Sequence, residues 1–152
     1  MTTTTTMAEL PGLVGTGLGT SDWHEVTQEH VNQFADATGD HQWIHVDVER
    51  AKKESPFGGP IAHGYLTLSL VVPLAAQVLT VTDVAMGVNY GLNKVRFPAP
   101  VPVGSKVRDS VTLKDVEQVT GGLQLTLVVT VEPEGGDKPV CIAEWVFRHY
   151  GG

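Results

Sequence analysis

Between Thr27 and Gly39, apolar residues recur at intervals of three and four, which predicts a short amphipathic helix. Thr27 is a favourable residue for capping the start of a helix, and Gly39 is a favourable residue just past its end. The positions that set this period are Val31, Phe34, Ala35 and Thr38. Residues 48–54, VERAKKE, are expected to add one or two polar helical turns.

The longest apolar run covers residues 61–81 and follows the glycines and proline at 58–60. It is apolar almost all round, which predicts a helix enclosed by other structure. Pro73 removes one backbone hydrogen bond and is expected to bend this helix. Polar residues inside the run and the lack of flanking basic anchors argue against a membrane span.

In the second half of the chain the period changes to two. Residues 86–97 are extended in character, and alternate apolar residues in three later segments fall on one face. These are Val107, Val111 and Leu113, then Leu123, Leu125, Leu127, Val129 and Val131, then Cys141, Ala143, Trp145 and Phe147. The glycine pairs at 121–122 and 135–136 predict consecutive hairpins, and SDWHEVT near the start is a further strand candidate. Helices before strands predict an α+β fold with an antiparallel sheet against the apolar helix.

Composition narrows the class of protein. A chain of 152 residues can form one domain that buries roughly two thirds of the surface of its unfolded form. An apolar content of 41% and a charged content of 18% are ordinary for a globular protein. A net charge of −7 argues against nucleic acid as a partner, because that affinity depends on clustered Lys and Arg.

The N-terminal segment MTTTTTMAEL has neither the basic start nor the apolar core of a signal peptide. We therefore expect residues 1–10 to be a disordered tail and residues 11–152 to form a single domain. The lone Cys141 lies among strand-like neighbours and is interpreted as a small buried hydrophobe with no disulfide role, which fits a reducing cytoplasm.

The stretch ATGDHQWIHVD, residues 37–47, holds the first candidate chemistry. In a helix, the spacing of Asp40 and His45 would leave their side chains about 140° apart, and in a strand it would put them on opposite faces. If they act together, we expect a tight irregular loop turned at Gly39. A carboxylate and an imidazole that converge on one water make a general acid/base pair. The alternative is an Asp40 that stabilises the turn and a packed or surface His45.

Gly64 is the second candidate. It lies at the expected first turn of the buried helix, where backbone N–H groups have no internal partner and the helix dipole is positive. A substrate carbonyl could approach the bare backbone there, and the N–H could hold an oxyanion or enolate. The alternatives are that Gly64 only permits close packing against the sheet, and that His63 is a satisfied histidine at a helix start.

Other chemistries have less support. A metal ion is the rival use of the same region, with ligands from His45 and Asp47 and with Asp40, His41 and His63 nearby. This is not a specific metal pattern, and a single cysteine cannot supply the usual structural zinc sets. Ser69 lies in mid-helix without a GxSxG elbow, so a Ser-His-Asp hydrolase is poorly supported. Neither GxGxxG nor GxxxxGK[ST] occurs to hold a nucleotide phosphate.

Taken together, ATGDHQWIHVD and the later GGPIAHGYLTLSL resemble the MaoC-like dehydratase family, specifically the (R)-specific enoyl-CoA hydratases (hydratase 2) of the small single-domain actinobacterial type. The family pattern is roughly G-D-x-N-P-x-H-x-D/E followed by P-I-x-H-G. The matching residues are Gly39, Asp40, Ile44, His45, Asp47, Pro60, Ile61, His63 and Gly64. Residues 89–108 also resemble the strand and loop that follow, and the likeness covers most of residues 20–150.

The resemblance implies a hot-dog fold, in which an antiparallel sheet wraps a long central helix, and a homodimer. It implies an (R)-specific enoyl-CoA hydratase, or 3-hydroxyacyl-thioester dehydratase, of fatty-acid metabolism. Such a hydro-lyase adds water reversibly and syn to a trans-2-enoyl thioester of coenzyme A or acyl carrier protein. Neither a metal nor a redox cofactor is expected, and neither nucleic acid nor a membrane is an expected partner.

The resemblance also implies residue roles. Asp40 and His45 would be the hydration pair, and the amide of Gly64 would bind the thioester carbonyl. Substrate contacts are expected from His63, Tyr65, Trp43, Gln42, Asn89 and Arg96. Lys94, Arg96, Lys106 and Arg108 are candidates for the phosphates of coenzyme A, or else solvated strand charges.

Two departures from the family pattern leave the preferred acyl length open. Gln42 and Trp43 replace the usual Asn-Pro, and Val72 stands where members often carry a polar residue. Two other functions remain as alternatives. A hot-dog thioesterase would release free coenzyme A, and a non-catalytic acyl-thioester-binding subunit would turn over nothing. The presence of both Asp40 and His45 argues against the second.

Overall fold

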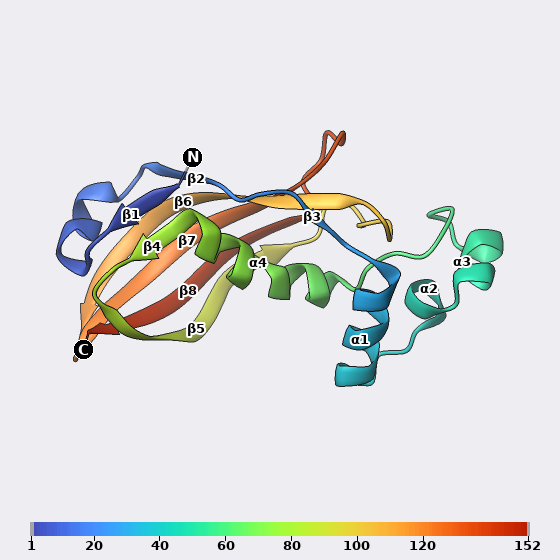
Figure 1. Cartoon of the computed structure of the whole chain (residues 1–152), viewed down its shortest axis with the longest axis horizontal. Coiled ribbons are helices and arrows are strands. Elements are labelled where there is room, and N and C mark those ends of the chain that lie inside the picture. The colour runs from blue at the N-terminus through green and yellow to red at the C-terminus, as the bar shows by residue number, and fades with distance from the viewer. Residues whose placement is uncertain (1, 152) are drawn as a thin grey trace.

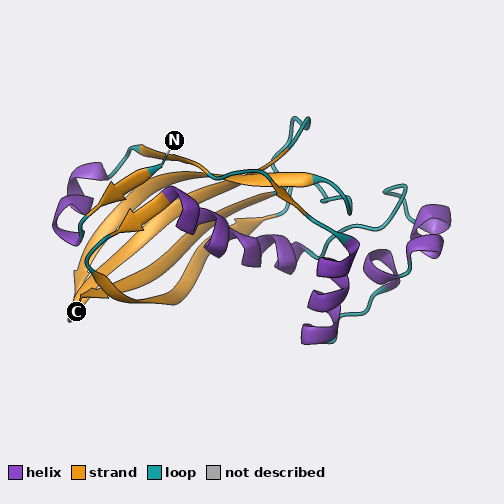
Figure 2. Ribbon diagram, in the orientation of Figure 1, coloured by secondary structure: helices purple, strands orange, loops and turns teal. Residues whose placement is uncertain are grey.

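A long apolar helix lies against one antiparallel sheet in the computed structural model, which describes residues 2–151 (Figures 1 and 2). The helices are η1 (Met7–Leu13, 3-10), α1 (Gln28–Thr38), α2 (Trp43–Val46), α3 (Val48–Glu54) and α4 (Gly64–Val78). The strands are β1 (Thr3–Thr5), β2 (Gly17–Thr20), β3 (His24–Glu25), β4 (Leu79–Val81), β5 (Val84–Arg96), β6 (Lys106–Val119), β7 (Gly122–Pro133) and β8 (Cys141–Gly151). The α+β expectation is confirmed.

The main sheet has the strand order β2-β6-β7-β8-β5, with β3 also pairing with β6. Both predicted hairpins are present: β6 joins β7, and β7 joins β8, all antiparallel. Gly121 and Gly135 adopt the left-handed backbone that these turns require, with φ of 82° and 74°. β5 forms an edge of the sheet, paired with β8 alone.

The core lies between α4 and the concave face of the sheet. The predicted alternation is confirmed, because the period-two residues on β6, β7 and β8 are buried there, apart from the half-buried Trp145. The helix contributes Leu66, Leu70, Val71, Leu74, Ala75 and Val78. Asp109 shares the buried face of β6, where an acidic side chain is unexpected among the apolar residues. α4 continues through Pro73, and the apolar run then ends in β4.

The N-terminal segment is ordered against this core. β1 pairs in parallel with β4, matching Thr3 with Leu79 and Thr5 with Val81. Leu10 in η1 is fully buried within the main hydrophobic cluster. The expectation of a disordered tail over residues 1–10 is therefore wrong for residues 2–10. Threonine is β-branched and suits a strand, and β4 offered an unpaired edge that the sequence pattern did not reveal.

Helices α1, α2 and α3 gather beside the N-terminal end of α4, at the opposite end of the molecule from β1 and β4 (Figure 1). α1 begins and ends as predicted, because the Thr27 side chain accepts from the His30 N–H and Gly39 closes the helix with φ of 85°. Within residues 2–151, no helix combines the length and apolarity needed to cross a membrane.

Candidate active site

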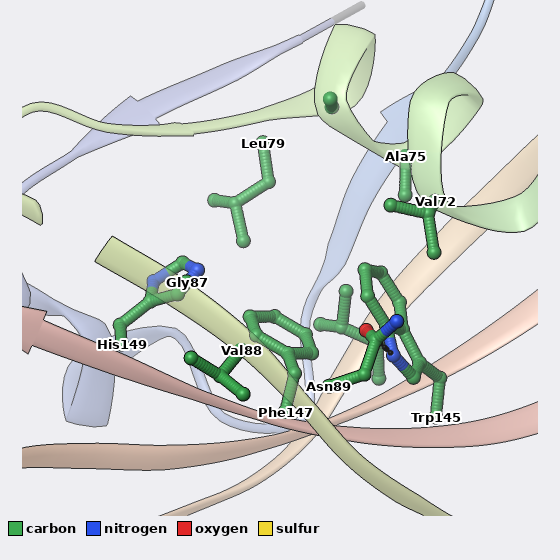
Figure 3. Close-up of a pocket in the computed structure, with 11 residues that line it drawn as sticks. Val72, Ala75, Leu79, Gly87, Val88, Asn89, Trp145, Phe147 and His149 are labelled. Atoms are coloured by element: carbon green, nitrogen blue, oxygen red, sulfur yellow. Dashed lines mark hydrogen bonds between the residues drawn. The ribbon is translucent and has the colours of Figure 1, made fainter.

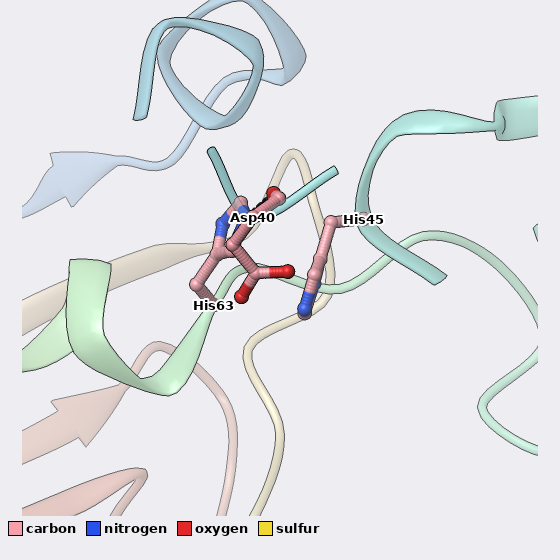
Figure 4. Close-up of side chains that lie close together, drawn as sticks. All are labelled: Asp40, His45 and His63. Atoms are coloured by element: carbon pink, nitrogen blue, oxygen red, sulfur yellow. Dashed lines mark hydrogen bonds between the residues drawn. The ribbon is translucent and has the colours of Figure 1, made fainter. Parts of the chain in front are cut away.

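Three side chains converge beside the N-terminus of α4 (Figure 4). Asp40 comes from the α1–α2 connection, His45 from α2 and His63 from the residue before α4. One polar atom of each side chain, a carboxylate oxygen or a ring nitrogen, lies within 4.8 Å of the corresponding atoms of the other two. The two imidazoles are buried, at 6% and 2% exposure, whereas Asp40 is exposed to solvent. The structure thus brings Asp40 and His45 together, and their catalytic roles remain a prediction.

The local fold differs from the predicted irregular loop. Gly39 ends α1 in the left-handed conformation and turns the chain. His45 then lies in α2, a single helical turn in which the Asp47 N–H donates to the Trp43 carbonyl over 3.1 Å. The Asp47 side chain in turn caps α3 through the Arg50 N–H. Asp40 and His45 therefore meet because the chain reverses at Gly39 and then forms the short helix α2.

Hydrogen bonds orient the His45 ring. Its Nδ1 lies 2.7 Å from the main-chain oxygen of Ile61. A carbonyl can only accept, so Nδ1 carries the proton, and Nε2 of the neutral ring is a free acceptor. The Gln28 side-chain amide donates to the His45 carbonyl over 2.8 Å and fixes α2 against α1. Burial lowers the pKa of His45 below its ordinary value, and the neighbouring His63 adds to this.

Gly64 is the first residue of α4. Within residues 2–151 its N–H has no hydrogen-bond partner, as expected at the first turn of a helix. Its backbone is helical, and an added Cβ would lie 3.4 Å from the Phe97 ring, which is an ordinary contact. Neither backbone conformation nor lack of space therefore requires a glycine here.

The other expected substrate contacts have different surroundings. Tyr65 is 72% exposed and meets Phe97 edge-on. The Arg50 guanidinium lies over the Trp43 ring at 4.2 Å, and the Gln42 N–H points to the Asp40 carboxylate at 3.4 Å.

Two of the expected contacts lie on β5. Arg96 precedes Phe97 and donates to the Val95 carbonyl over 2.7 Å. Asn89 accepts a 2.9 Å hydrogen bond from Trp145 Nε1. Within residues 2–151 no hydrogen bond joins either residue to Asp40, His45 or His63. The family resemblance implied that both residues contact the substrate. The sequence gave no indication that Arg96 bonds to Val95 or that Asn89 bonds to Trp145.

A groove follows α4 on the side of β5 and β8 (Figure 3). It consists of two hollows of about 220 and 280 Å³ with mainly apolar walls. Val72, Asn89 and Trp145 line both hollows. The sequence did not reveal this groove, because its walls combine residues of α4, β4 and β5 with residues of β7 and β8 much later in the chain.

Of the four candidate cations for the phosphates of coenzyme A, Arg108 already forms an ion pair with a carboxylate. Arg108 pairs with Glu132 over 3.0 Å and lies over the Trp23 ring at 4.5 Å. The side chains of Lys94, Arg96 and Lys106 are exposed. Arg108 therefore behaves as a strand charge, whereas Lys94, Lys106 and Arg96, the last hydrogen-bonded to the Val95 carbonyl, are exposed to a phosphate in solvent.

Asp40, His45 and His63 could also be considered as metal ligands. The two rings, however, stack with centroids 3.9 Å apart and planes inclined by 24°. A metal ion binds an imidazole in the plane of the ring, so stacked rings direct their lone pairs side by side. This arrangement suits a hydrogen-bonded water between carboxylate and imidazole better than one ion shared by both rings.

The comparisons agree on one family. The MaoC like domain matches residues 9–133. The chain is 55% identical over 150 residues to 3-hydroxyacyl-thioester dehydratase Z of Mycobacterium tuberculosis, covering 98% of this chain and 99% of that protein. It is 46% identical over 143 residues to Nodulation protein N of Rhizobium leguminosarum bv. viciae, covering 92% and 88%. The solved R-hydratase PhaJ1 from Pseudomonas aeruginosa has the same fold, with a TM-score of 0.73 at 22% identity over 91% of this chain and 83% of that one. The chain therefore belongs to the MaoC-like dehydratase family and has its hot-dog fold.

Proposed function

We propose that the protein is an (R)-specific enoyl-thioester hydratase, which converts a trans-2-enoyl thioester and water reversibly into the (R)-3-hydroxyacyl thioester. The observation that carries the proposal is the convergence of the Asp40 carboxylate and the His45 imidazole beside the first turn of α4. The name of the Mycobacterium tuberculosis relative, a 3-hydroxyacyl-thioester dehydratase, describes the reverse direction of the same reaction.

The acid/base pair would hold one water molecule. The Asp40 carboxylate and the free His45 Nε2 are both acceptors, so they can take the two O–H groups of that water and leave its lone pairs facing the substrate. As the oxygen attacks C3, one of the pair takes a proton. The same pair then delivers a proton to C2, on the same face. Atoms and charge balance without electron transfer, so the step needs no redox cofactor.

Gly64 would stabilise the intermediate. Attack at C3 moves negative charge onto the thioester oxygen, and the free N–H at the start of α4 can donate to it. The dipole of this helix has its positive end there. One such donor contributes on the order of 3 kcal/mol to the transition state. A glycine that neither backbone nor packing requires is consistent with close approach of substrate.

The acyl chain would follow the groove beside α4. This groove starts at Leu68, one helical turn past Gly64, and reaches Leu79. Its walls are mainly apolar, which suits a hydrocarbon chain. Coenzyme A is the proposed carrier, since its phosphates could meet Lys94 and Arg96 at the end of β5. The buried thiol of Cys141 is compatible with a cytoplasmic location.

A homodimer is the proposed assembly. β5 is an edge strand of the sheet, and such an edge leaves backbone donors and acceptors open to another chain. Its large apolar side chains are exposed in the single chain, namely Met86, Val88, Tyr90 and Leu92 at 44–63%. An apolar edge of this length is a favourable place for a second copy to pair.

The test of function is a spectroscopic assay of the purified protein with crotonyl-CoA. The proposal predicts loss of the enoyl absorbance, formation of (R)-3-hydroxybutyryl-CoA, no free thiol and the same rate in EDTA. Release of free coenzyme A would instead assign a thioesterase. Binding of the acyl-CoA without turnover would assign a non-catalytic subunit, and inhibition by EDTA would revive the metal alternative.

A further inference from the structure

We infer that His63 is a positioning residue that holds Asp40 and His45 in their reactive arrangement, and that it is not a contact for the substrate. The inference rests on the proposed hydratase function. His63 is 2% exposed, so its ring offers almost no surface to a bound molecule. Its ring instead contacts Asp40 and His45, the two residues proposed to hold the water.

The first contact fixes Asp40. His63 Nε2 lies 2.9 Å from the main-chain oxygen of Asp40, and this N–H must donate because the oxygen can only accept. Asp40 lies in the connection between α1 and α2 and is exposed, so few other contacts restrain it. Its own N–H reaches the Thr38 hydroxyl over a longer distance of 3.3 Å. The bond from His63 is thus the shortest tie between Asp40 and the core.

The second contact fixes the plane of the His45 ring. The His63 ring stacks on His45 with centroids 3.9 Å apart, and the tilted Phe34 ring also packs against His63 with centroids 4.9 Å apart. Stacking sets the tilt of His45, while its bond to the Ile61 carbonyl sets its rotation. The Ile61 N–H also donates to the Ile44 carbonyl over 3.0 Å. The segment from Ile61 to His63 therefore braces α2 and Asp40 from one side.

His63 also connects this brace to Gly64. It is the residue before α4, and its carbonyl accepts from the Leu66 N–H over 3.1 Å. One residue thus carries a bond to Asp40, a stacking contact with His45 and the start of the helix that presents the Gly64 N–H. A displacement of about 1 Å among such groups can reduce a rate by about 10²-fold, which is why a buried ring can matter to the rate without touching substrate.

Two substitutions separate the contacts. His63→Phe keeps a ring for stacking but removes the N–H donor. His63→Gln removes the ring but can place an amide N–H near the position that Nε2 occupies in the wild type. We expect His63→Phe to lower kcat by about 10- to 100-fold with little change in KM, because misplaced groups slow the reaction without weakening binding. His63→Gln should recover a large part of that loss. His41→Gln is the matched control, because His41 pairs with Asp36 on the surface, and it should leave kcat unchanged.

Hydrogen exchange of residues 39–42 tests the brace without using activity. Exchange should become faster in His63→Phe than in the wild type, and less so in His63→Gln. A wild-type kcat in His63→Phe, a change confined to KM, or unchanged exchange in that variant would overturn the inference. A wild-type protein that hydrates no enoyl thioester would refute the proposed function instead, and the exchange measurement would still decide whether His63 holds Asp40.

Discussion

The Nδ1–H of His45 donates to the main-chain oxygen of Ile61 over 2.7 Å, and this one bond decides which nitrogen faces the substrate site. Ile61 lies two residues before His63, in the segment that leads into α4. The tautomer of His45 is therefore set by the segment that also presents Gly64. A neutral His45 with a free Nε2 can accept a proton from water, whereas its protonated form cannot.

The pH dependence of activity follows from the burial of His45. Burial lowers the pKa of this imidazole below 6.5, so the ring stays neutral to a lower pH than an exposed histidine. We expect kcat/KM to be constant near neutral pH and to fall only as the pH drops through a midpoint below 6.5. A pH–rate profile checks this, and a midpoint above that value would show that another group controls the acid limb.

Substitution of Gly64 should separate stability from activity. The backbone there is helical and an added methyl would only touch Phe97, so Gly64→Ala should fold and gain up to about 1 kcal/mol in free energy of unfolding. In the proposed complex the substrate approaches the bare backbone of this residue, so we expect the methyl to displace it, and a displaced substrate can cost about 10²-fold in rate. Urea unfolding and crotonyl-CoA kinetics on the same sample measure both effects. A fully active Gly64→Ala enzyme would contradict the close approach of the substrate to this residue, although its N–H would still be present.

Asp109 should make the fold less stable as the pH rises. The side chain is fully buried, neither carboxyl oxygen has a hydrogen-bond partner among residues 2–151, and burial raises its pKa from 3.8 to about 8. Between these two values the unfolded state loses the proton and the folded state keeps it. The free energy of unfolding therefore decreases with pH across that window, by at most about 1.4 kcal/mol per unit.

The variant Asp109→Asn removes this titration. Its stability relative to the wild type should increase from pH 5 to pH 8, the window that the raised pKa defines. Asp115→Asn, on the exposed part of the same strand, is the matched control and should leave the slope unchanged. Urea unfolding at several pH values gives the comparison, and parallel curves for Asp109→Asn and the wild type would contradict this account.

The edge strand should control assembly. Leu92 on β5 is 44% exposed in the single chain, and Leu92→Lys would place a charge in the proposed pairing surface. We expect the wild type to show twice the chain mass in light scattering and Leu92→Lys to shift toward one chain. Ile142→Lys on β8 is a suitable control, because Ile142 is also exposed but lies on a strand with neighbours on both sides. A dimeric Leu92→Lys protein would place the interface elsewhere.

Local sequence patterns predicted those elements of the fold that depend on interactions between residues close together in the chain. Thr27 and Gly39 mark the ends of α1 because capping depends on a few neighbouring atoms. The period of two in the last three strands follows directly from having one buried face. That same period places Asp109 on the buried face, so the position of this acid can be read from the sequence.

Contacts between distant segments could not be predicted in this way. The pairing of Thr3 with Leu79 joins positions whose local sequences show no link, so the ordered N-terminus was missed. The spacing of Asp40 and His45 only excluded regular structure, and the structure met that condition with a turn followed by one helical turn. The stacking of His63 on His45 depends on how α2 packs beside α4, and the spacing of residues along the chain does not predict such packing.

The most direct test of the account compares crotonyl-CoA hydration by the wild type with that by Asp40→Asn and His45→Gln. Each variant keeps the approximate shape of the site but replaces a group that can exchange a proton with the water by an amide that cannot, so each should retain its fold and its KM while kcat falls by about 10²- to 10⁴-fold. Circular dichroism confirms the fold before the assay. Wild-type kcat in either variant would contradict the proposal that Asp40 and His45 together activate one water molecule.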